Sequence, residues 1–134
     1  MAKEFFIKDL NELDNFARDL TESLKGDEII LLNGDLGAGK TTFTKILLKH
    51  LGVSEDVISP TFTIMNNFSG KFDIYHIDMY RLDGFDISDI VGKGLIVIEW
   101  PKGDEFKNYG VPVYKIDIEV SDDGSRIFRI DKIA

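Results

Sequence analysis

Residues 34–41, Gly-Asp-Leu-Gly-Ala-Gly-Lys-Thr, have the composition and spacing of a phosphate-binding loop. Glycines reach backbone angles that are closed to other residues, so successive N–H groups can turn inward and surround an anion. Lys40 adds a positive charge for the outer phosphates, and Thr41 supplies a hydroxyl ligand for Mg²⁺. The pattern predicts a site for a nucleoside triphosphate. The predicted contacts come from Gly34, Asp35, Leu36, Gly37, Ala38, Gly39, Lys40, Thr41 and Thr42.

The segments on either side of the loop have the patterns that such a loop needs. Residues 28–33, Glu-Ile-Ile-Leu-Leu-Asn, form an apolar run typical of a strand buried on both faces of a parallel sheet. After the loop, apolar residues recur at helical spacing until Gly52, which can end a helix. The N-terminus of that helix carries unpaired N–H groups and the positive end of the helix dipole. Both favour the same anion.

Two acidic residues follow apolar runs elsewhere in the chain. Asp78 ends Phe-Asp-Ile-Tyr-His-Ile-Asp, and Glu99 directly follows Leu-Ile-Val-Ile. Because parallel strands end at the same edge of a sheet, we expect both carboxylates near the phosphates. A phosphate-loop hydrolase needs one carboxylate for Mg²⁺ and one group that orients or deprotonates the attacking water. The pattern leaves open which residue has which role.

A proline-containing segment, Ser59-Pro60-Thr61-Phe62-Thr63, comes after the predicted loop helix and a connecting strand at residues 57–58. Hydroxyls around a rigid turn are suited to cover a γ-phosphate and to change order on hydrolysis, as switch loops do. A plain turn into the next hairpin explains the same residues equally well. Ser59, Thr61 and Thr63 are therefore candidates for a switch-like segment.

The remaining patterns predict elements that extend the sheet. Apolar residues at helical spacing predict a helix over residues 9–25, with Asp9 and Glu12 as a capping box. Alternating segments around turn residues predict hairpins within residues 61–80 and 113–130. The expected fold is α/β, a three-layer P-loop NTPase-type domain whose parallel central strands are extended by antiparallel hairpins.

Composition limits the classes of function. The chain has 134 residues, which we expect to form a single domain over 1–134. It has no cysteine, which excludes thiolate metal sites, and it has only two histidines. A net charge of −8 and a pI near 4.7 argue against strong direct binding to nucleic acid, which needs clustered Lys and Arg. Because the sequence has no long apolar segment and no signal-like N-terminus, we expect a cytoplasmic protein that does not bind membranes.

Four motifs occur in a characteristic order: the loop through Phe43, then Ser-Pro-Thr-Phe-Thr-Ile, His-Ile-Asp-Met-Tyr-Arg-Leu and Ile-Glu-Trp-Pro. This succession, across residues 10–101, resembles the TsaE family, also called YjeE. The resemblance implies a bacterial ATPase that supports threonylcarbamoyl-adenosine synthesis on tRNA. It also implies that ATP is hydrolysed, with Mg²⁺, in complex with the partner proteins TsaD and TsaB.

By the same resemblance, Lys40 and the loop amides hold the phosphates and Thr41 coordinates Mg²⁺. Asp78 takes the Walker B position of the family, and Glu99 also lies at the metal or the water. The segment between Arg81 and Ile98 is shorter than is usual in the family. Loops of this kind often carry partner-docking surfaces, so the difference bears on docking rather than on nucleotide chemistry.

Two other functions fit a phosphate loop. A small kinase would transfer the γ-phosphate to a metabolite, but the sequence shows no arginine-rich lid segment to hold the transferring group. A nucleotide-dependent interaction module would differ from the ATPase only in turnover, which is low in many such proteins until a partner supplies a catalytic group.

Overall fold

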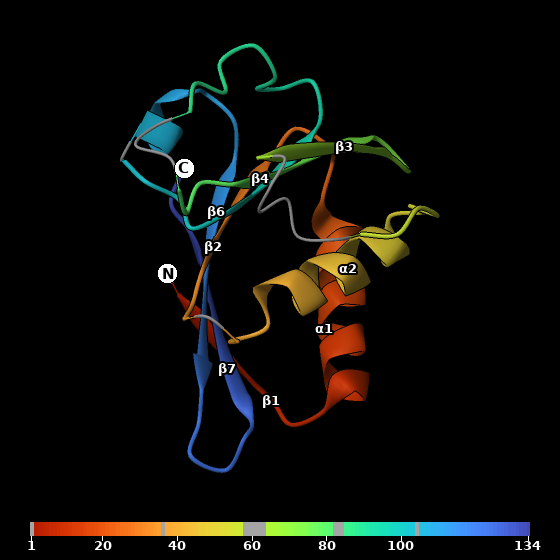
Figure 1. Cartoon of the computed structure of the whole chain (residues 1–134), viewed down its shortest axis with the longest axis vertical. Helices are drawn as coiled ribbons and strands as arrows, with labels where there is room; N and C mark the ends of the chain where they lie inside the picture. Colours follow the sequence, from red (N-terminus) through yellow and green to blue (C-terminus); the bar gives the residue numbers. More distant parts are fainter. Residues whose placement is uncertain (1, 36, 58–63, 82–84, 104) are drawn as a thin grey trace.

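The computed structural model describes residues 2–35, 37–57, 64–81, 85–103 and 105–134. The described strands form one seven-stranded sheet in the order β1-β7-β6-β2-β5-β4-β3, and two helices lie together against it (Figure 1). Some of the residues singled out above lie outside the described ranges: Leu36, Ser59, Thr61, Thr63 and Ile58, the last of which belongs to the predicted connecting strand.

The centre of the sheet is parallel. Strand β2 (Ile29–Asn33) pairs on one side with β5 (Leu95–Glu99) and on the other with β6 (Val113–Val120), and β4 (Asp73–Asp78) pairs with β5. Every residue of β5 and nearly every residue of β2 is buried, as expected for strands that are covered on both faces. Both apolar runs are therefore central strands, as the sequence predicts.

Antiparallel strands extend this centre at both edges. Strand β3 (Met65–Ser69) forms a hairpin with β4, and β7 (Arg126–Lys132) forms a hairpin with β6. Both predicted hairpins are confirmed. The sequence did not predict β1 (Lys3–Ile7), which pairs with β7. Its residues are mostly exposed, so it has no alternating pattern, and its partner lies at the other end of the chain.

The two helices end close to the predicted residues. Helix α1 (Leu10–Ser23) begins at Asp9, whose carboxylate accepts a hydrogen bond from the Glu12 backbone N–H at 2.9 Å. It ends two residues before the predicted position. Helix α2 (Lys40–His50) follows the phosphate loop, and Gly52, with φ of +86°, continues the chain beyond it.

Two apolar clusters cover the two faces of the sheet. The first packs both helices against residues such as Ile30, Val97 and Phe128. The second, around Ile29 and Ile98, is covered by turns and a 3₁₀ helix (Glu105–Asn108) rather than by a long helix in the described part. The α/β fold with a parallel centre and antiparallel extensions is confirmed. In the described residues, neither helix is long and apolar enough to cross a membrane.

Candidate active site

The loop between β2 and α2 has the backbone conformation that its glycines predict, with one difference. Gly37 and Gly39 have φ of +81° and +105°, in the left-handed region where a side chain is strained. Gly34 is needed for another reason, because a Cβ there would lie 2.9 Å from the carbonyl oxygen of Ile118 on β6. Gly39 is also the N-cap of α2 and has no side chain to bond the first N–H groups. These amides are therefore available to an anion.

Lys40 lies along the loop with its ammonium group against the backbone. Its Nζ donates to the carbonyl oxygens of Gly34 and Asp35, the latter at 3.2 Å. Burial lowers the pKa of Lys40 from its ordinary value of 10.5, although the carboxylates of Glu99, Asp35 and Asp78 act in the opposite direction. A cation that is poorly hydrated and held beside the loop interacts strongly with phosphate, because little water screens it.

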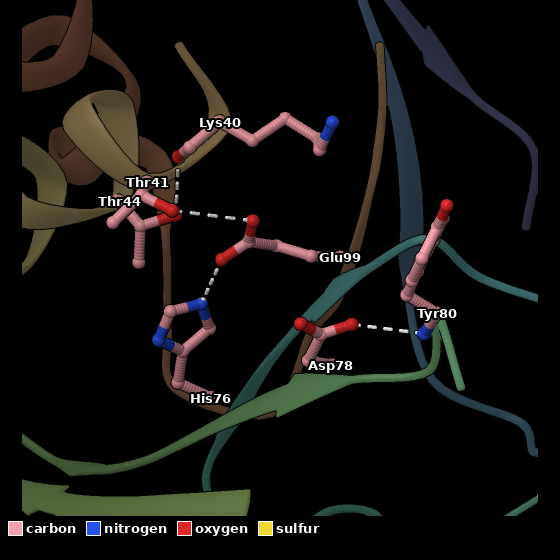
Figure 2. A network of polar contacts seen from close by, with 7 residues as sticks. All are labelled: Lys40, Thr41, Thr44, His76, Asp78, Tyr80 and Glu99. Carbon is pink, nitrogen blue, oxygen red and sulfur yellow. Dashed lines mark hydrogen bonds and ion pairs between the residues drawn. The ribbon is translucent and has the colours of Figure 1, made fainter. Parts of the chain in front are cut away.

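Glu99, at the carboxyl end of β5, lies between the loop helix and β4 (Figure 2). Its Oε1 accepts a long hydrogen bond, 3.4 Å, from the hydroxyl of Thr41, and its Oε2 lies 2.5 Å from Nε2 of His76. The side chain is only 3% exposed. One carboxylate oxygen therefore faces the phosphate loop, and the other faces the interior of the sheet.

Asp78 ends β4 and lies opposite Glu99 in the strand register. Its Oδ1 accepts from the backbone N–H of Tyr80 at 2.8 Å (Figure 2), and the residue is 8% exposed. The structure therefore brings both predicted carboxylates to the carboxyl ends of neighbouring strands, and Glu99 there contacts Thr41.

Trp100 follows Glu99 and covers Lys40. The Lys40 Nζ lies 3.8 Å from the centre of the indole ring. The ring of Tyr80 packs against the same indole, with the two ring centroids 4.8 Å apart. The backbone of Trp100 has φ of +58°, a left-handed conformation that is costly for any residue with a Cβ. Its N–H donates to the carbonyl oxygen of Leu32, which fixes this conformation to the central strand.

Arg126, at the start of β7, supports the loop from the other side. Its Nε donates to the carbonyl oxygen of Ala38 at 2.8 Å, and its side chain lies beside Gly39. This brings a second cation to the loop from a strand far away in the sequence. Its place could not be predicted, because only the pairing of β7 with β6 aligns it with the loop.

These residues all line one cleft, at the carboxyl ends of the central strands. A second pocket adjoins this cleft at Gly39 and Thr42, with walls from the start of α1 and from Phe128. The two share Gly39, Thr42 and Arg126. The residues that line the first cleft are Gly37, Gly39, Lys40, Thr41, Thr42, Asp78, Tyr80, Arg81, Glu99, Trp100 and Arg126.

The donor set of the cleft consists of oxygen atoms. Thr41 offers a hydroxyl, and Asp78 and Glu99 offer carboxylates; no group of three or more His, Cys, Asp or Glu suited to a metal occurs among the described residues. Mg²⁺ is typically held by one or two carboxylates together with phosphate oxygens and water, rather than by a complete protein cage. The residues therefore fit Mg²⁺ bound together with a nucleotide, and do not fit a zinc site.

Comparison with known proteins assigns the chain. The profile described as "Threonylcarbamoyl adenosine biosynthesis protein TsaE" matches residues 7–128. The chain belongs to the TsaE family. This match extends well beyond the motifs of residues 10–101 and includes all of the cleft, up to Arg126.

Individual relatives agree with this assignment. Proteins named tRNA threonylcarbamoyladenosine biosynthesis protein TsaE from Aquifex aeolicus and Rickettsia prowazekii are each 38% identical to this chain. The first alignment covers 97% of this chain and 96% of the relative, and the second covers 90% and 89%. The crystal structure of Bacillus subtilis YdiB superposes with a TM-score of 0.80 at 27% identity, over 100% of this chain and 87% of that one. The Aquifex aeolicus relative matches over nearly all of both chains, so that TsaE protein and this chain have nearly the same length.

The sequence pointed to the loop, Asp78 and Glu99, which the structure brings to one cleft, but it did not predict which neighbouring side chains contact them. It gave His76 no role, whereas the structure places this residue against Glu99. It also gave Trp100 no role, whereas the indole ring lies over Lys40. For His76 a signal was present: a lone polar residue among apolar neighbours, two positions before Asp78 on the same side of the strand.

Proposed function

We propose that this TsaE family member is an ATPase that supports threonylcarbamoyladenosine modification of tRNA. The observation that carries the proposal is the convergence of Lys40, Thr41, Asp78 and Glu99 on one cleft at the carboxyl edge of the sheet. Two buried carboxylates that line one cleft can hold Mg²⁺ and orient a water, and nucleotide binding alone does not require both roles. The names of the relatives supply the pathway.

The two pockets suggest how ATP lies. We expect the phosphates along the loop amides, with Lys40 and Arg126 providing positive charge. The second pocket, which shares Gly39 and Thr42 with the cleft, has apolar walls from Leu13 and Phe128 that suit the flat aromatic face of the base. Both pockets are lined by Gly39 and Thr42, so the two groups of contacts meet at the start of α2.

The carboxylates divide the remaining work. The hydroxyl of Thr41 and Oε1 of Glu99 are adjacent, which favours Glu99 on the metal side and leaves Asp78 to orient the attacking water. The water oxygen attacks the γ-phosphorus, the bond to the bridging oxygen of ADP breaks, and a proton passes to the carboxylate. Magnesium, when bound, neutralises charge on the outer phosphate oxygens.

We also propose that turnover depends on TsaD and TsaB in the cytoplasm, and that the 134-residue chain acts as one unit. The described part of the cleft has no arginine-rich lid, so a group supplied by a partner would complete the charge stabilisation of the transferring phosphate. The proposal does not include strong direct binding of tRNA by this chain, because a net charge of −8 repels the phosphate backbone.

The test combines binding and turnover. Calorimetric titration with ATP and Mg²⁺ should show binding by the chain alone, and phosphate release should rise when TsaD and TsaB are added. Lys45→Ala is a matched control for Lys40→Ala, because Lys45 lies on the same helix but is exposed outside the cleft. Phosphate release that stays unchanged on adding both partners would contradict the partner-dependent ATPase.

A further inference from the structure

His76 is a fully buried histidine that contacts Glu99 from behind the active cleft. It lies on β4 between Tyr75 and Ile77, and its side chain is 0% exposed. In the strand register it is opposite Val97, two positions before the Asp78 and Glu99 pair. Since side chains alternate along a strand, His76 points to the same face as Asp78. This face is otherwise filled by apolar side chains such as Ile74 and Val97, which pack with the helices.

The ring has one polar partner in the described structure. Nε2 lies 2.5 Å from Oε2 of Glu99, whereas Nδ1 has no hydrogen-bond partner among the described residues (Figure 2). Two lone pairs would repel at such a separation, so one proton lies between the nitrogen and the oxygen. An imidazole is costly to bury, and an apolar side chain would fill the same volume at lower cost.

The surroundings of the two ring nitrogens indicate whether His76 or Glu99 donates the hydrogen bond between them. If Nε2–H donates to Glu99, the buried Nδ1 is left with an unpaired lone pair. If Glu99 donates instead, a buried Nδ1–H is left without an acceptor. Orphaned N–H groups are the rarer of the two in native proteins. The structure therefore favours a ring whose Nε2–H donates to Oε2 of Glu99.

We propose that His76 is a positioning residue for the ATPase site, which holds Oε2 of Glu99 so that Oε1 stays beside Thr41. A carboxylate has two equivalent oxygens and a loosely restrained terminal torsion. The hydrogen bond from His76 removes this freedom, since Oε2 is fixed from the interior and Oε1 is left at 3.4 Å from the Thr41 hydroxyl. This inference rests on the proposed ATPase function and adds a residue that never touches the nucleotide.

Two amide substitutions separate positioning from packing. In His76→Gln the amide nitrogen is as many bonds from Cβ as Nε2 is, so it can reach Glu99. In His76→Asn the amide nitrogen matches Nδ1 and is too short. With TsaD and TsaB present, we expect the single-turnover rate to fall about 10-fold in His76→Asn and to recover largely in His76→Gln. The dissociation constant of ATP should change less than about twofold in both.

A double-mutant cycle locates the effect. In a Glu99→Gln background, His76→Asn should cause no further loss of rate, because the carboxylate that it positions is already gone. Equal rates for wild type and His76→Asn would overturn the proposal. So would equal losses in the Asn and Gln variants, or full additivity with Glu99→Gln, each of which indicates a packing role.

A spectroscopic measurement tests the hydrogen bond without ATP turnover. In ¹⁵N-labelled wild-type protein, two-bond ¹H–¹⁵N spectra should show His76 as the Nε2–H tautomer. The chain has two histidines, so the signal missing in His76→Gln assigns the resonance. An Nδ1–H tautomer would overturn the inference even if the ATPase proposal stands. If wild type hydrolyses no ATP with its partners, the proposed function fails while this spectrum still tests the contact.

Discussion

Two buried glutamates, at opposite ends of neighbouring central strands, show that the same side chain has two different roles in this fold. Glu28 directly precedes β2 and is 2% exposed, and Glu99 ends the neighbouring strand β5 and is 3% exposed. Glu28 accepts from three backbone N–H groups, those of Lys25, Gly26 and Asp27, at 2.7, 2.9 and 3.2 Å. Within the described part of the chain, Glu99 accepts from two side chains, those of His76 and Thr41.

The difference lies in what remains available to a ligand. The carboxylate of Glu28 is surrounded by the amides of the turn between α1 and β2, so it stabilises that turn and fixes the start of the central strand. Among the described residues, one oxygen of Glu99 is held by His76, and the other has one long contact, with Thr41, and faces a cleft. Burial alone therefore does not identify a catalytic carboxylate, whereas unfinished coordination beside a phosphate loop does.

The largest effect is expected at Glu99. Glu99→Gln should lower the rate of ATP hydrolysis about 100-fold or more, because it removes the negative oxygen beside Thr41. ATP binding should persist, and the free energy of unfolding should change by less than about 1 kcal/mol, since a neutral amide is easier to bury than a charge. Single-turnover kinetics and urea denaturation measure the two quantities. A rate close to that of wild type would remove Glu99 from the site.

The second effect concerns affinity. Lys40→Ala should weaken ATP binding about 30-fold or more, because it deletes a desolvated cation that pairs with phosphate. Calorimetric titration measures the change, with Lys45→Ala as the control that should match wild type. Unchanged affinity in Lys40→Ala would contradict the phosphate-loop assignment.

Glu28 provides the opposite case. Glu28→Gln should destabilise the fold by about 1–3 kcal/mol, since an amide NH₂ group would then face backbone N–H donors that need an acceptor. Hydrolysis per folded molecule should equal that of wild type. Urea denaturation and active-site titration together distinguish the two. A Glu28→Gln protein that is as stable as wild type but hydrolyses ATP more slowly would contradict the proposed difference between Glu28 and Glu99.

The smallest effect is expected at Trp100. Trp100→Leu removes the aromatic face above Lys40, and cation–π contacts of this type contribute about 1 kcal/mol. ATP affinity should fall roughly fivefold, and Trp100→Phe, which keeps a ring, should lose less. Titration of both variants measures this. Identical losses in the two would show that the ring's bulk matters and its π-face does not.

Sequence reasoning reached the parts of the site whose chemistry is local. The loop, its strand and its helix are contiguous in the chain, and Asp78 and Glu99 are marked by the apolar runs before them. Contacts made by sheet pairing were not accessible. Arg126 reaches Ala38 because β7 lies next to β6, and His76 meets Glu99 because β4 lies next to β5. Strand order depends on packing of the whole chain, which no local pattern contains.

The most direct test is a crystal structure of this chain with Mg²⁺ and a non-hydrolysable ATP analogue. We expect the triphosphate to follow the loop amides, with Nζ of Lys40 within hydrogen-bond distance of the outer phosphates. We also expect the metal at the hydroxyl of Thr41, with Glu99 or Asp78 in contact directly or through one water. A nucleotide bound elsewhere, or a metal distant from both carboxylates, would contradict the proposed site.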